Sequence, residues 1–206
     1  MPDMVAIIDY GMGNVGSVKN AIAFLGGEAV LTNRPEDIEK ASHIILPGVG
    51  AFGDGMRNLE RSGLVDVLKK EVFENGKLFL GICLGMQLLA EAGEEGGEHA
   101  GLGWIKGRVR KLRVDEMKYR LPHVGWNDVS PKESATLFKD VQPSIFYFVH
   151  SFAVEPKEPE DIAATCDYGG PFAAAIQRKN IFGVQFHPEK SQKSGLAVLR
   201  NFLQLN

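Results

Sequence analysis

The first half of the chain alternates short apolar segments with longer segments of helical spacing. Four apolar runs are typical of buried strands: "VAIIDY" (5–10), "EAVLT" (28–32), "SHIILPGVG" (42–50) and "KLFLGI" (77–82). Two segments between them have helical apolar spacing: "SVKNAIAFLGG" (17–27) and "MRNLERSGLVDVLKKEVFENG" (56–76). Short buried strands that alternate with helices indicate βαβ units. The sequence therefore predicts a parallel sheet that is covered on both faces.

The second half of the chain is richer in strands. After Gly93 five segments are strand-like, with few helices between them: "LGWIKGRVRKLRV" (102–114), "SIFYFVHSFAVE" (144–155), "DIAATCDY" (161–168), "PFAAAIQRK" (171–179) and "NIFGVQFH" (180–187). The final segment, "SQKSGLAVLRNFLQLN" (191–206), returns to helical spacing. Since no linker or repeat divides the 206 residues, we expect one domain over residues 1–206. Its predicted fold is a three-layer α/β fold with a mixed central sheet and an antiparallel extension, in which ligands bind beyond the carboxyl ends of the strands.

Composition and charge exclude several classes of protein. An apolar fraction of 44% with 24% charged residues is ordinary for a globular protein. The net charge is −3 and no Lys/Arg cluster forms a stripe suited to a phosphate backbone, so we expect no nucleic-acid binding. The run at 78–90 is too short and too broken by glycine to cross a bilayer, and the first residues lack the basic stretch of a signal peptide. The two cysteines, Cys83 and Cys166, lack zinc-site spacing. We expect a cytoplasmic protein without membrane, metal or cofactor.

A glycine-rich segment, "GMGNVG" (11–16), follows the first predicted strand and precedes a helix. The pattern G-x-G-x-x-G in this position is that of a dinucleotide-binding turn. The second strand, however, ends at "LTNRP" without the acidic residue that would bind a ribose, because Glu36 and Asp37 come after Pro35. We therefore interpret the segment as a glycine-rich turn without a nucleotide.

Cys83 stands between two glycines where the fourth predicted strand gives way to a helix. The segment "GICLG" (81–85) has the form of a nucleophile elbow, in which small neighbours permit a sharp turn from strand to helix. At the start of a helix, free N–H groups and the helix dipole favour a thiolate. The alternative is a structural cysteine in the core, where free cysteines are commonly buried.

A second candidate lies in "FGVQFHPEKS" (182–191). His187 and Glu189 are two residues apart, so both side chains lie on one side of an extended segment, which Pro188 stiffens. The carboxylate can then hold one imidazole nitrogen and leave the other to serve a nucleophile. The alternative is an exposed histidine that has a glutamate nearby.

The two candidates can meet in a parallel sheet. Cys83 ends one predicted strand and His187 follows another, so both can lie at the same sheet edge. Backbone N–H groups in "ILPGVGAF" (45–52) would supply an oxyanion hole there. The chain order of cysteine, histidine and glutamate differs from that of α/β-hydrolases, in which the acid precedes the histidine.

Three segments as a set, "PGVG" (47–50), "GICLGMQLL" (81–89) and "VQFHPEKS" (184–191), resemble the signatures of class I, triad-type glutamine amidotransferases. The resemblance implies their flavodoxin-like α/β fold. Three further segments are similar to the glutaminase subunits of imidazole glycerol phosphate synthase, over nearly the whole chain: "DYGMGN" (9–14), "LPHVGWNDV" (121–129) and "FYFVHSF" (146–152). The resemblance implies hydrolysis of L-glutamine, with the ammonia passed to a (β/α)8 cyclase subunit in histidine biosynthesis.

The resemblance also implies roles for individual residues. Cys83 would attack the glutamine amide, His187 would transfer protons, and Glu189 would orient His187. The backbone of three residues would form the oxyanion hole: Gly48, Val49 and Leu84. Six residues would hold the substrate: Gly50, Gln87, Glu95, His150, Ser151 and Phe152. The family usually has tyrosine in place of Phe152, which puts the contact through that ring in doubt. Four residues are candidates for the surface that meets the cyclase: Met12, Asn14, Trp126 and Lys190. Trp126 would be an exposed anchor there, unless it is buried within the chain.

Other interpretations stay open. The chain could be the glutaminase of another synthase, such as anthranilate or aminodeoxychorismate synthase, although "HVGWNDV" and "DYGMGN" argue against this. It could also be a noncatalytic binding module, which would predict an incomplete triad. Of the remaining residues, His43 is expected at a strand edge, His99 on the surface, Cys166 in the core and Trp104 in packing.

Overall fold

The computed structural model describes residues 4–206. The strands of its larger sheet are β1 (Val5–Ile8), β2 (Ala29–Thr32), β3 (His43–Gly48), β4 (Leu78–Cys83), β8 (His123–Pro131), β9 (Ile145–His150), β11 (Ile162–Asp167), β12 (Pro171–Arg178) and β13 (Ile181–Val184). The smaller sheet consists of β5 (Ala90–Gly93), β6 (His99–Ala100), β7 (Ile105–Lys111) and β10 (Phe152–Pro156). The α-helices are α1 (Val15–Phe24), α2 (Pro35–Lys40), α3 (Phe52–Arg61), α4 (Val65–Phe73), α5 (Leu84–Gln87) and α6 (Gln192–Leu203). Short 3₁₀ turns lie at Thr136–Phe138, Pro159–Asp161 and Pro188–Lys190.

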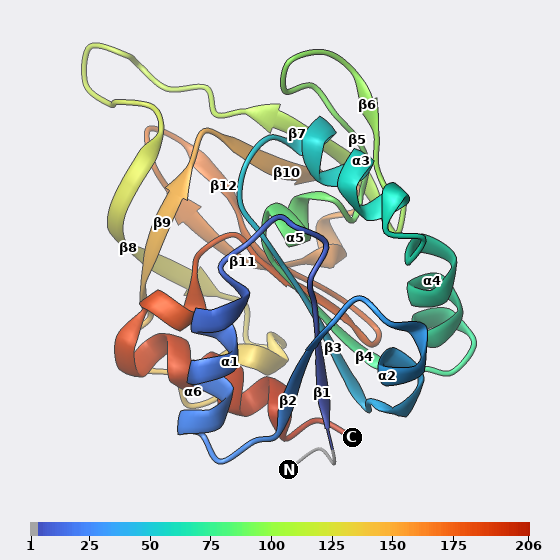
Figure 1. The fold of residues 1–206 in the computed structure, drawn as a ribbon. Coiled ribbons are helices and arrows are strands. Elements are labelled where there is room, and N and C mark those ends of the chain that lie inside the picture. Colours follow the sequence, from blue (N-terminus) through green and yellow to red (C-terminus); the bar gives the residue numbers. More distant parts are fainter. Residues whose placement is uncertain (1–3) are drawn as a thin grey trace.

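The larger sheet has nine strands in the order β2-β1-β3-β4-β13-β12-β11-β8-β9, and the smaller has the order β10-β7-β5-β6 (Figure 1). The first five strands of the large sheet run parallel, in the strand order of a doubly wound, flavodoxin-like sheet. The other four continue it with antiparallel pairings. The predicted α/β fold, with a mixed sheet and an antiparallel extension, is confirmed.

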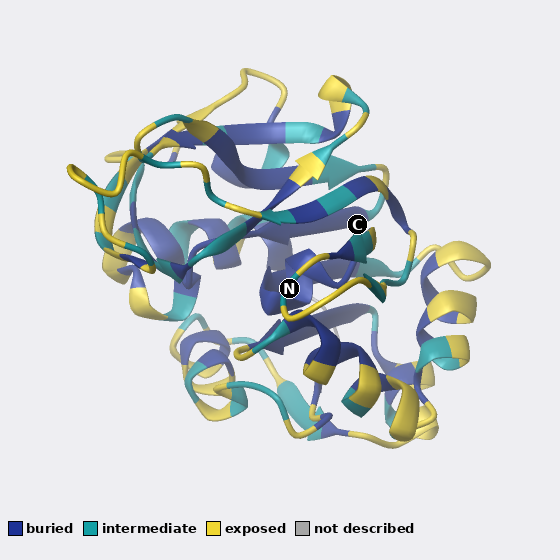
Figure 2. Ribbon diagram, turned by 90° about the horizontal axis from the view of Figure 1, so that it is seen from above, coloured by how far each residue is buried: buried dark blue, intermediate teal, exposed yellow. Residues whose placement is uncertain are grey.

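Strand β1 illustrates why both faces of the sheet are covered. Its four residues are all fully buried. Val5 and Ile7 contribute to the core on the side of α1 and α6, whereas Ala6 and Ile8 contribute to the core on the side of α2, α3 and α4. Because successive side chains point to opposite faces, a strand without polar residues needs apolar partners on both. Figure 2 shows the buried strands between helices whose outer faces are exposed.

The helices differ from the predicted ones in two places. The predicted helix over 56–76 is two helices, α3 and α4, separated by a turn in which Gly63 has a φ of +71°. That backbone conformation suits glycine and ends the first helix. Helix α2 was not predicted, although Pro35 in its first turn, followed by Glu36 and Asp37, is a helix-start signal. No helix within residues 4–206 is long and apolar enough to cross a membrane.

The second sheet also changes two predicted elements. The helix after the fourth strand has only four residues, because the carbonyl of Leu89 accepts N–H bonds from Trp104 and Ile105, each 2.9 Å long, and draws the chain into β5. The predicted strand over 144–155 is divided at Ser151: β9 belongs to the large sheet and β10 to the small one. Local pattern did not reveal these changes because they depend on pairing between distant segments.

A buried ion pair fixes the start of β4. Lys77 Nζ lies 2.7 Å from Glu71 Oε2, and the two side chains are 13% and 2% exposed. The ammonium group also donates to the carbonyls of Ile38 and Glu39, at 2.8 and 2.6 Å. Burial raises the pKa of Glu71, but the hydrogen bonds from Lys77 and Asn75 outweigh it and hold that pKa below its usual value. Lys77 thus joins α4 and the end of α2 to the strand that carries Cys83.

We expect Lys77→Met to lower the free energy of unfolding by about 3 kcal/mol at neutral pH, because it leaves the Glu71 carboxylate buried without its cation. Since the folded pKa of Glu71 is depressed, the contribution of the pair is present above the ordinary value of 4.5 and is lost as the pH falls. Chemical denaturation measures the change. Lys69→Met, at an exposed position of α4, the helix that carries Glu71, is the control and should cost less than about 0.5 kcal/mol. Equal losses in the two variants would contradict the assignment.

Candidate active site

Three neighbouring parallel strands end at the same edge of the large sheet. Gly48 at the end of β3 is paired with Cys83 at the end of β4, and Ile82 is paired with Val184 at the end of β13. The segment after Gly48, the thiol of Cys83 and the segment after Val184 are therefore adjacent although they are far apart in the sequence. Beyond such strand ends α/β proteins bind their ligands.

Cys83 occupies a sharp turn between β4 and α5. Its φ and ψ are 53° and −110°, and the helix begins at the next residue. A non-glycine residue held at such φ and ψ values costs about 1–3 kcal/mol, and strained residues of this kind cluster at functional sites. The flanking glycines provide space for the turn. A Cβ on Gly81 would lie 2.6 Å from the carbonyl oxygen of Gly85, and a Cβ on Gly85 would collide with the carbonyl oxygen of Leu46. Cys83 thus has the geometry of a nucleophile elbow.

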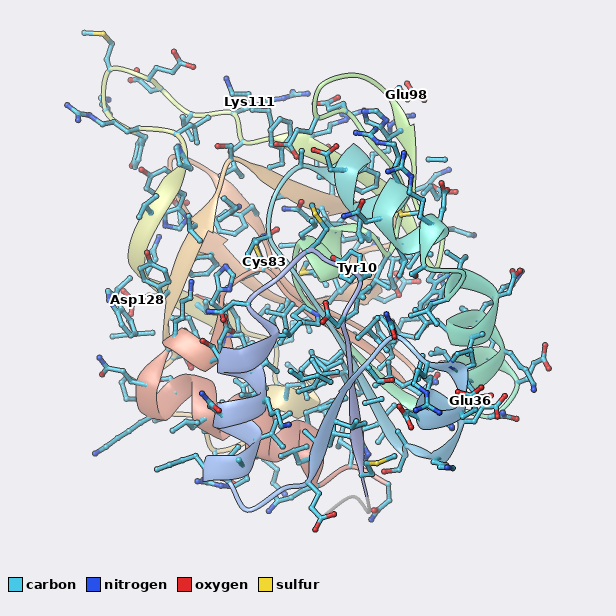
Figure 3. All side chains as sticks on the ribbon, in the orientation of Figure 1. Tyr10, Glu36, Cys83, Glu98, Lys111 and Asp128 are labelled. Atoms are coloured by element: carbon cyan, nitrogen blue, oxygen red, sulfur yellow. The ribbon has the colours of Figure 1, made fainter. Side chains whose placement is uncertain are left out.

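A cavity of about 290 Å³ opens beside Cys83. It is lined by Val49, Gly50, Cys83, Leu84, Gln87, Glu95, Val149, His150, Ser151, Phe152 and His187. All residues that were expected to hold the substrate lie on its wall. Gly48 and Glu189 do not line it, and Glu189 instead borders a separate crevice between α1 and α6. Figure 3 shows Cys83 in the interior near Tyr10, whereas the labelled Glu36, Glu98, Lys111 and Asp128 lie at the periphery.

The imidazole of His187 is held by Glu189. Its Nδ1 atom lies 2.9 Å from Glu189 Oε1, and both side chains are 2% exposed. The backbone of His187 is fixed as well, since its N–H donates to Tyr147 O at 2.9 Å and its carbonyl accepts from Ser191 Oγ at 2.6 Å. The other ring nitrogen, Nε2, is buried without a well-aligned hydrogen bond among residues 4–206 and is the one left to serve Cys83. Such catalytic contacts often tighten only when substrate binds.

The charge state of His187 follows from these neighbours. Burial by itself lowers the pKa of the imidazole, but interaction with the Cys83 sulfur and then with the Glu189 carboxylate outweighs it and raises the pKa to about 9. At neutral pH the ring is therefore an imidazolium, and it lies beside the Cys83 sulfur. Tyr10 is buried nearby, and burial, followed by interaction with Cys83, raises its pKa, which keeps the phenol protonated.

Gln185 is a residue of this site that the sequence did not reveal. It is fully buried, and its Nε2 donates to the Cys83 sulfur at 3.6 Å. Its Oε1 accepts from Gln87 Nε2 at 3.0 Å, and the same Gln87 nitrogen donates to the Phe152 carbonyl at 2.9 Å. Gln185 precedes His187 by two residues in an extended segment, so the period-two spacing that joined His187 to Glu189 also contained this signal.

The segment after β3 contains residues that are expected to form the oxyanion hole. Gly50 has a φ of +107°, which favours glycine, and Val49 beside it is 42% exposed. Gly48 is packed closely, because a Cβ there would lie 2.5 Å from Tyr10 Oη and 2.9 Å from Leu84 Cβ. Glu95 is anchored next to this segment, since its Oε2 accepts from the N–H of Phe52 at 2.9 Å.

The candidate interface residues lie around the same strand ends. Trp126 on β8 is 49% exposed and packs edge-to-face against Tyr147 at 6.0 Å between ring centres. Lys190 is exposed. Met12 is near Gly50, because a Cβ on that glycine would lie 2.9 Å from Met12 Cε. Asn14 caps α1, accepting from Ser17 N at 3.3 Å.

Residues assigned to other places lie mostly where expected. Cys166 is a core thiol, and burial raises its pKa to about 12. Trp104 packs edge-to-face on Phe79 at 5.0 Å. The strand-edge assignment of His43 is wrong: it is buried on β3 against the ring of Phe202, because β1 and β4 flank it. In the segment 11–16, residues 11–14 form the expected turn between β1 and α1, and Val15 and Gly16 begin the helix. Within residues 4–206 no group of three His, Cys, Asp or Glu side chains could hold a metal.

The sequence pattern of the family glutamine amidotransferase class-I matches residues 6–205, and the chain belongs to this family. Solved structures share the fold: a glutamine amidotransferase at a TM-score of 0.73 (20% identity, 97% of both chains covered) and PurLQS from Thermotoga maritima at 0.72 (20% identity, 98% of both chains covered).

Relatives with higher sequence identity show where the chain belongs within the class-I family. The chain is 48% identical to imidazole glycerol phosphate synthase subunit HisH 2 of Pseudomonas aeruginosa, covering 98% of this chain and 100% of the relative. It is 48% identical to HisH 2 of Methanococcus maripaludis, with 98% and 99% covered, and 49% identical to HisH of Moorella thermoacetica, with 98% and 94% covered. Within the class-I family the chain belongs with these HisH subunits.

The raised pKa of His187 gives a prediction. In an NMR titration of the chain, His187 should titrate near pH 9. In Cys83→Ala the neighbouring sulfur is absent, and we expect the midpoint to fall by about one unit or more because the imidazolium loses a negative partner. Cys166→Ala removes a thiol elsewhere and should leave the midpoint unchanged. An unchanged His187 midpoint in Cys83→Ala would show that the sulfur carries no charge beside the ring.

Proposed function

We propose that this chain is the glutaminase subunit of an imidazole glycerol phosphate synthase, and that Cys83, His187 and Glu189 are its catalytic triad. It hydrolyses L-glutamine to glutamate and ammonia, and a cyclase subunit uses the ammonia to make imidazole glycerol phosphate and AICAR in histidine biosynthesis. The observation that carries the proposal is the strained Cys83 beside an imidazole that Glu189 holds by a 2.9 Å bond, both opening on one cavity.

The first half of the reaction forms a thioester. The Cys83 thiolate attacks the side-chain carbonyl carbon of glutamine, and the carbonyl oxygen becomes an oxyanion. The backbone N–H groups of Val49 and Leu84, two residues that line the cavity, would stabilise that charge together with Gly48. His187 gives its proton to the departing nitrogen, so ammonia leaves and the ring becomes neutral.

The second half returns the enzyme to its starting state. Neutral His187 takes a proton from a water molecule, whose oxygen attacks the thioester carbonyl. The C–S bond breaks, glutamate leaves, and the thiolate again faces an imidazolium. Glu189 carries no proton in either half; it fixes the ring and stabilises its positive form.

The walls of the cavity suit the backbone groups of glutamine. Glu95 offers a carboxylate to the ammonium group, and the segment from His150 to Phe152 offers backbone groups from the edge of β10. Gln87 and Gly50 complete the wall. Phe152 cannot donate the hydrogen bond that a tyrosine would, so we assign it backbone and apolar contacts.

The partner is proposed to be a (β/α)8 cyclase that covers this sheet edge. Supporting this, Val124 and Trp126 are exposed on β8, and Val49 is exposed at the mouth of the cavity. An exposed indole that is rigidly placed on a strand is a suitable anchor for an interface. Met12, Asn14 and Lys190 surround the same edge. We further propose that residues 1–206 act as one domain in the cytoplasm, where the free thiol of Cys83 stays reduced.

The triad is tested by three substitutions. Cys83→Ala should abolish glutamine-dependent synthesis, while the complex with the cyclase still accepts free ammonium. His187→Asn should reduce glutaminase kcat by several orders of magnitude, and Glu189→Gln by less, because Glu189 only orients the ring. A larger defect in Glu189→Gln than in His187→Asn would contradict these roles. Labelling by a glutamine-analogue diazoketone checks the alternative of a binding module, which predicts no adduct on Cys83.

Coupling to the partner gives a separate prediction. The isolated chain should hydrolyse glutamine slowly, and the cyclase with its nucleotide ligand should raise kcat by orders of magnitude with a smaller effect on KM. We expect this because a peptide flip at Val49, between Gly48 and Gly50, would complete the oxyanion hole. Steady-state assays with and without partner measure it, and full activity of the chain alone would refute it.

The docking face can be tested in the same assays. Trp126→Ala should weaken the complex about tenfold or more. Phe73→Ala, which truncates an exposed aromatic on α4, is the matched control and should leave affinity unchanged. Equal weakening by both variants would place the interface elsewhere.

A further inference from the structure

A continuous series of hydrogen bonds runs through the interior from β8 to the sulfur of Cys83. It begins at Asn127, whose Nδ2 lies 3.4 Å from His123 Nε2, and continues from His123 Nδ1 to His150 Nε2 at 3.1 Å. His150 Nδ1 lies 2.9 Å from the carbonyl of Phe152. From that carbonyl the series continues through Gln87 to Gln185 and ends at Cys83 Sγ.

The direction of each bond follows from the Phe152 carbonyl, which can only accept. Gln87 must therefore present its NH₂ group to it, and the second N–H of that group donates to Gln185 Oε1. Gln185 then has its own NH₂ group facing the sulfur. The orientation of this amide, which is ambiguous for an isolated glutamine, is thus fixed by its neighbours.

The histidine half of the series has a fixed direction for the same reason. His150 donates from Nδ1 to the Phe152 carbonyl, so its Nε2 accepts from His123 Nδ1. This requires both rings to be neutral. Burial lowers the pKa of His150 to about 3, and burial lowers the pKa of His123 to about 4, which satisfies the requirement. Each ring then carries its proton on Nδ1.

We propose that Gln185 is a catalytic residue of the glutaminase reaction, which stabilises the Cys83 thiolate by donating a side-chain N–H bond to the sulfur. The inference rests on the proposed nucleophilic role of Cys83. His187 and Gln185 both belong to the segment that follows β13; Gln185 donates to the sulfur, and His187 Nε2 is left to serve it. The Gln185 bond fixes the direction in which the sulfur faces the cavity, and it strengthens whenever the sulfur becomes anionic, both before attack and when the thioester breaks.

A neutral amide suits this position better than a charged group. A cation there would compete with His187 for the thiolate, and an acceptor would repel it. The Gln185 side chain is fully buried, so its donor would lack a partner if the sulfur were absent. The bond to sulfur therefore satisfies the amide and stabilises the nucleophile at the same time.

The test measures the thiolate directly, in a Cys166→Ala background where Cys83 is the sole thiol. The rate of alkylation by iodoacetamide is recorded against pH for the parent, for Gln185→Leu and for Gln185→Glu. We expect the midpoint of the profile to move up by about one unit in the leucine variant, and further in the glutamate variant, which places a carboxylate beside the sulfur. In the complex with the cyclase, glutaminase kcat should fall roughly ten- to a hundredfold in Gln185→Leu, with little change in KM.

Gln177→Leu is the matched control. Gln177 lies on β12, where its Oε1 accepts from Thr136 N at 2.9 Å, and it has no hydrogen bond to Cys83. Its removal should leave the alkylation profile unchanged. Thermal unfolding identifies a variant that fails to fold, and Gln185→Met then replaces Gln185→Leu.

Two results would overturn the proposal. One is an alkylation midpoint that stays within about 0.3 unit of the parent in both Gln185 variants, or that moves equally in Gln177→Leu. The other is a Gln185→Leu variant whose glutaminase kcat in the complex with the cyclase equals that of the parent. If instead Cys83→Ala retained glutaminase activity while the Gln185 variants shifted the profile, the nucleophile assignment would fail and the thiolate contact would stand.

Discussion

The close approach of Gly81 and Gly85 is the contact on which the site depends. These two glycines leave the space in which β4 turns into α5, and that turn holds Cys83 at a φ of 53°. The conformation costs about 1–3 kcal/mol, and it persists because β4 is paired on both sides, with β3 and β13, and is buried almost throughout. The pairing and burial of β4 thus offset the strain at Cys83, and the thiol faces the cavity as a result.

Environment gives three buried histidines different charges within one region of the protein. His187 interacts with the Cys83 sulfur and the Glu189 carboxylate, and these interactions outweigh its burial and keep it positive. The hydrogen-bond partners of His123 and His150 are each other, an amide and a carbonyl, so burial dominates and both are neutral. The charge of each ring depends on its partners rather than on its burial, since all three rings are nearly inaccessible to solvent.

The sequence predicted the features that depend on local pattern. Apolar runs predicted the parallel strands, and the spacing of "GICLG" and "FHPE" singled out Cys83, His187 and Glu189 before their adjacency was visible. It did not predict the break at Gly63, where helical spacing continues on both sides, or the early end of α5, where pairing with Ile105 competes with the helix. Gln185 was missed for a stronger reason: its role depends on a sulfur 102 residues away, and that contact arises only when β13 pairs with β4.

The series of hydrogen bonds from β8 to the Cys83 sulfur has a consequence for proton transfer. Between the neutral histidines and the sulfur stand one backbone carbonyl and two primary amides, which neither gain nor lose protons near neutral pH. The series can hold the thiolate in place, yet it cannot deliver a proton to it or withdraw one. Among the described residues that contact the sulfur, His187 is the one that can exchange a proton with it. Proton transfer on the β8 side therefore does not reach the Cys83 sulfur. A partner that binds there can alter the position of the sulfur, while its protonation state depends on His187.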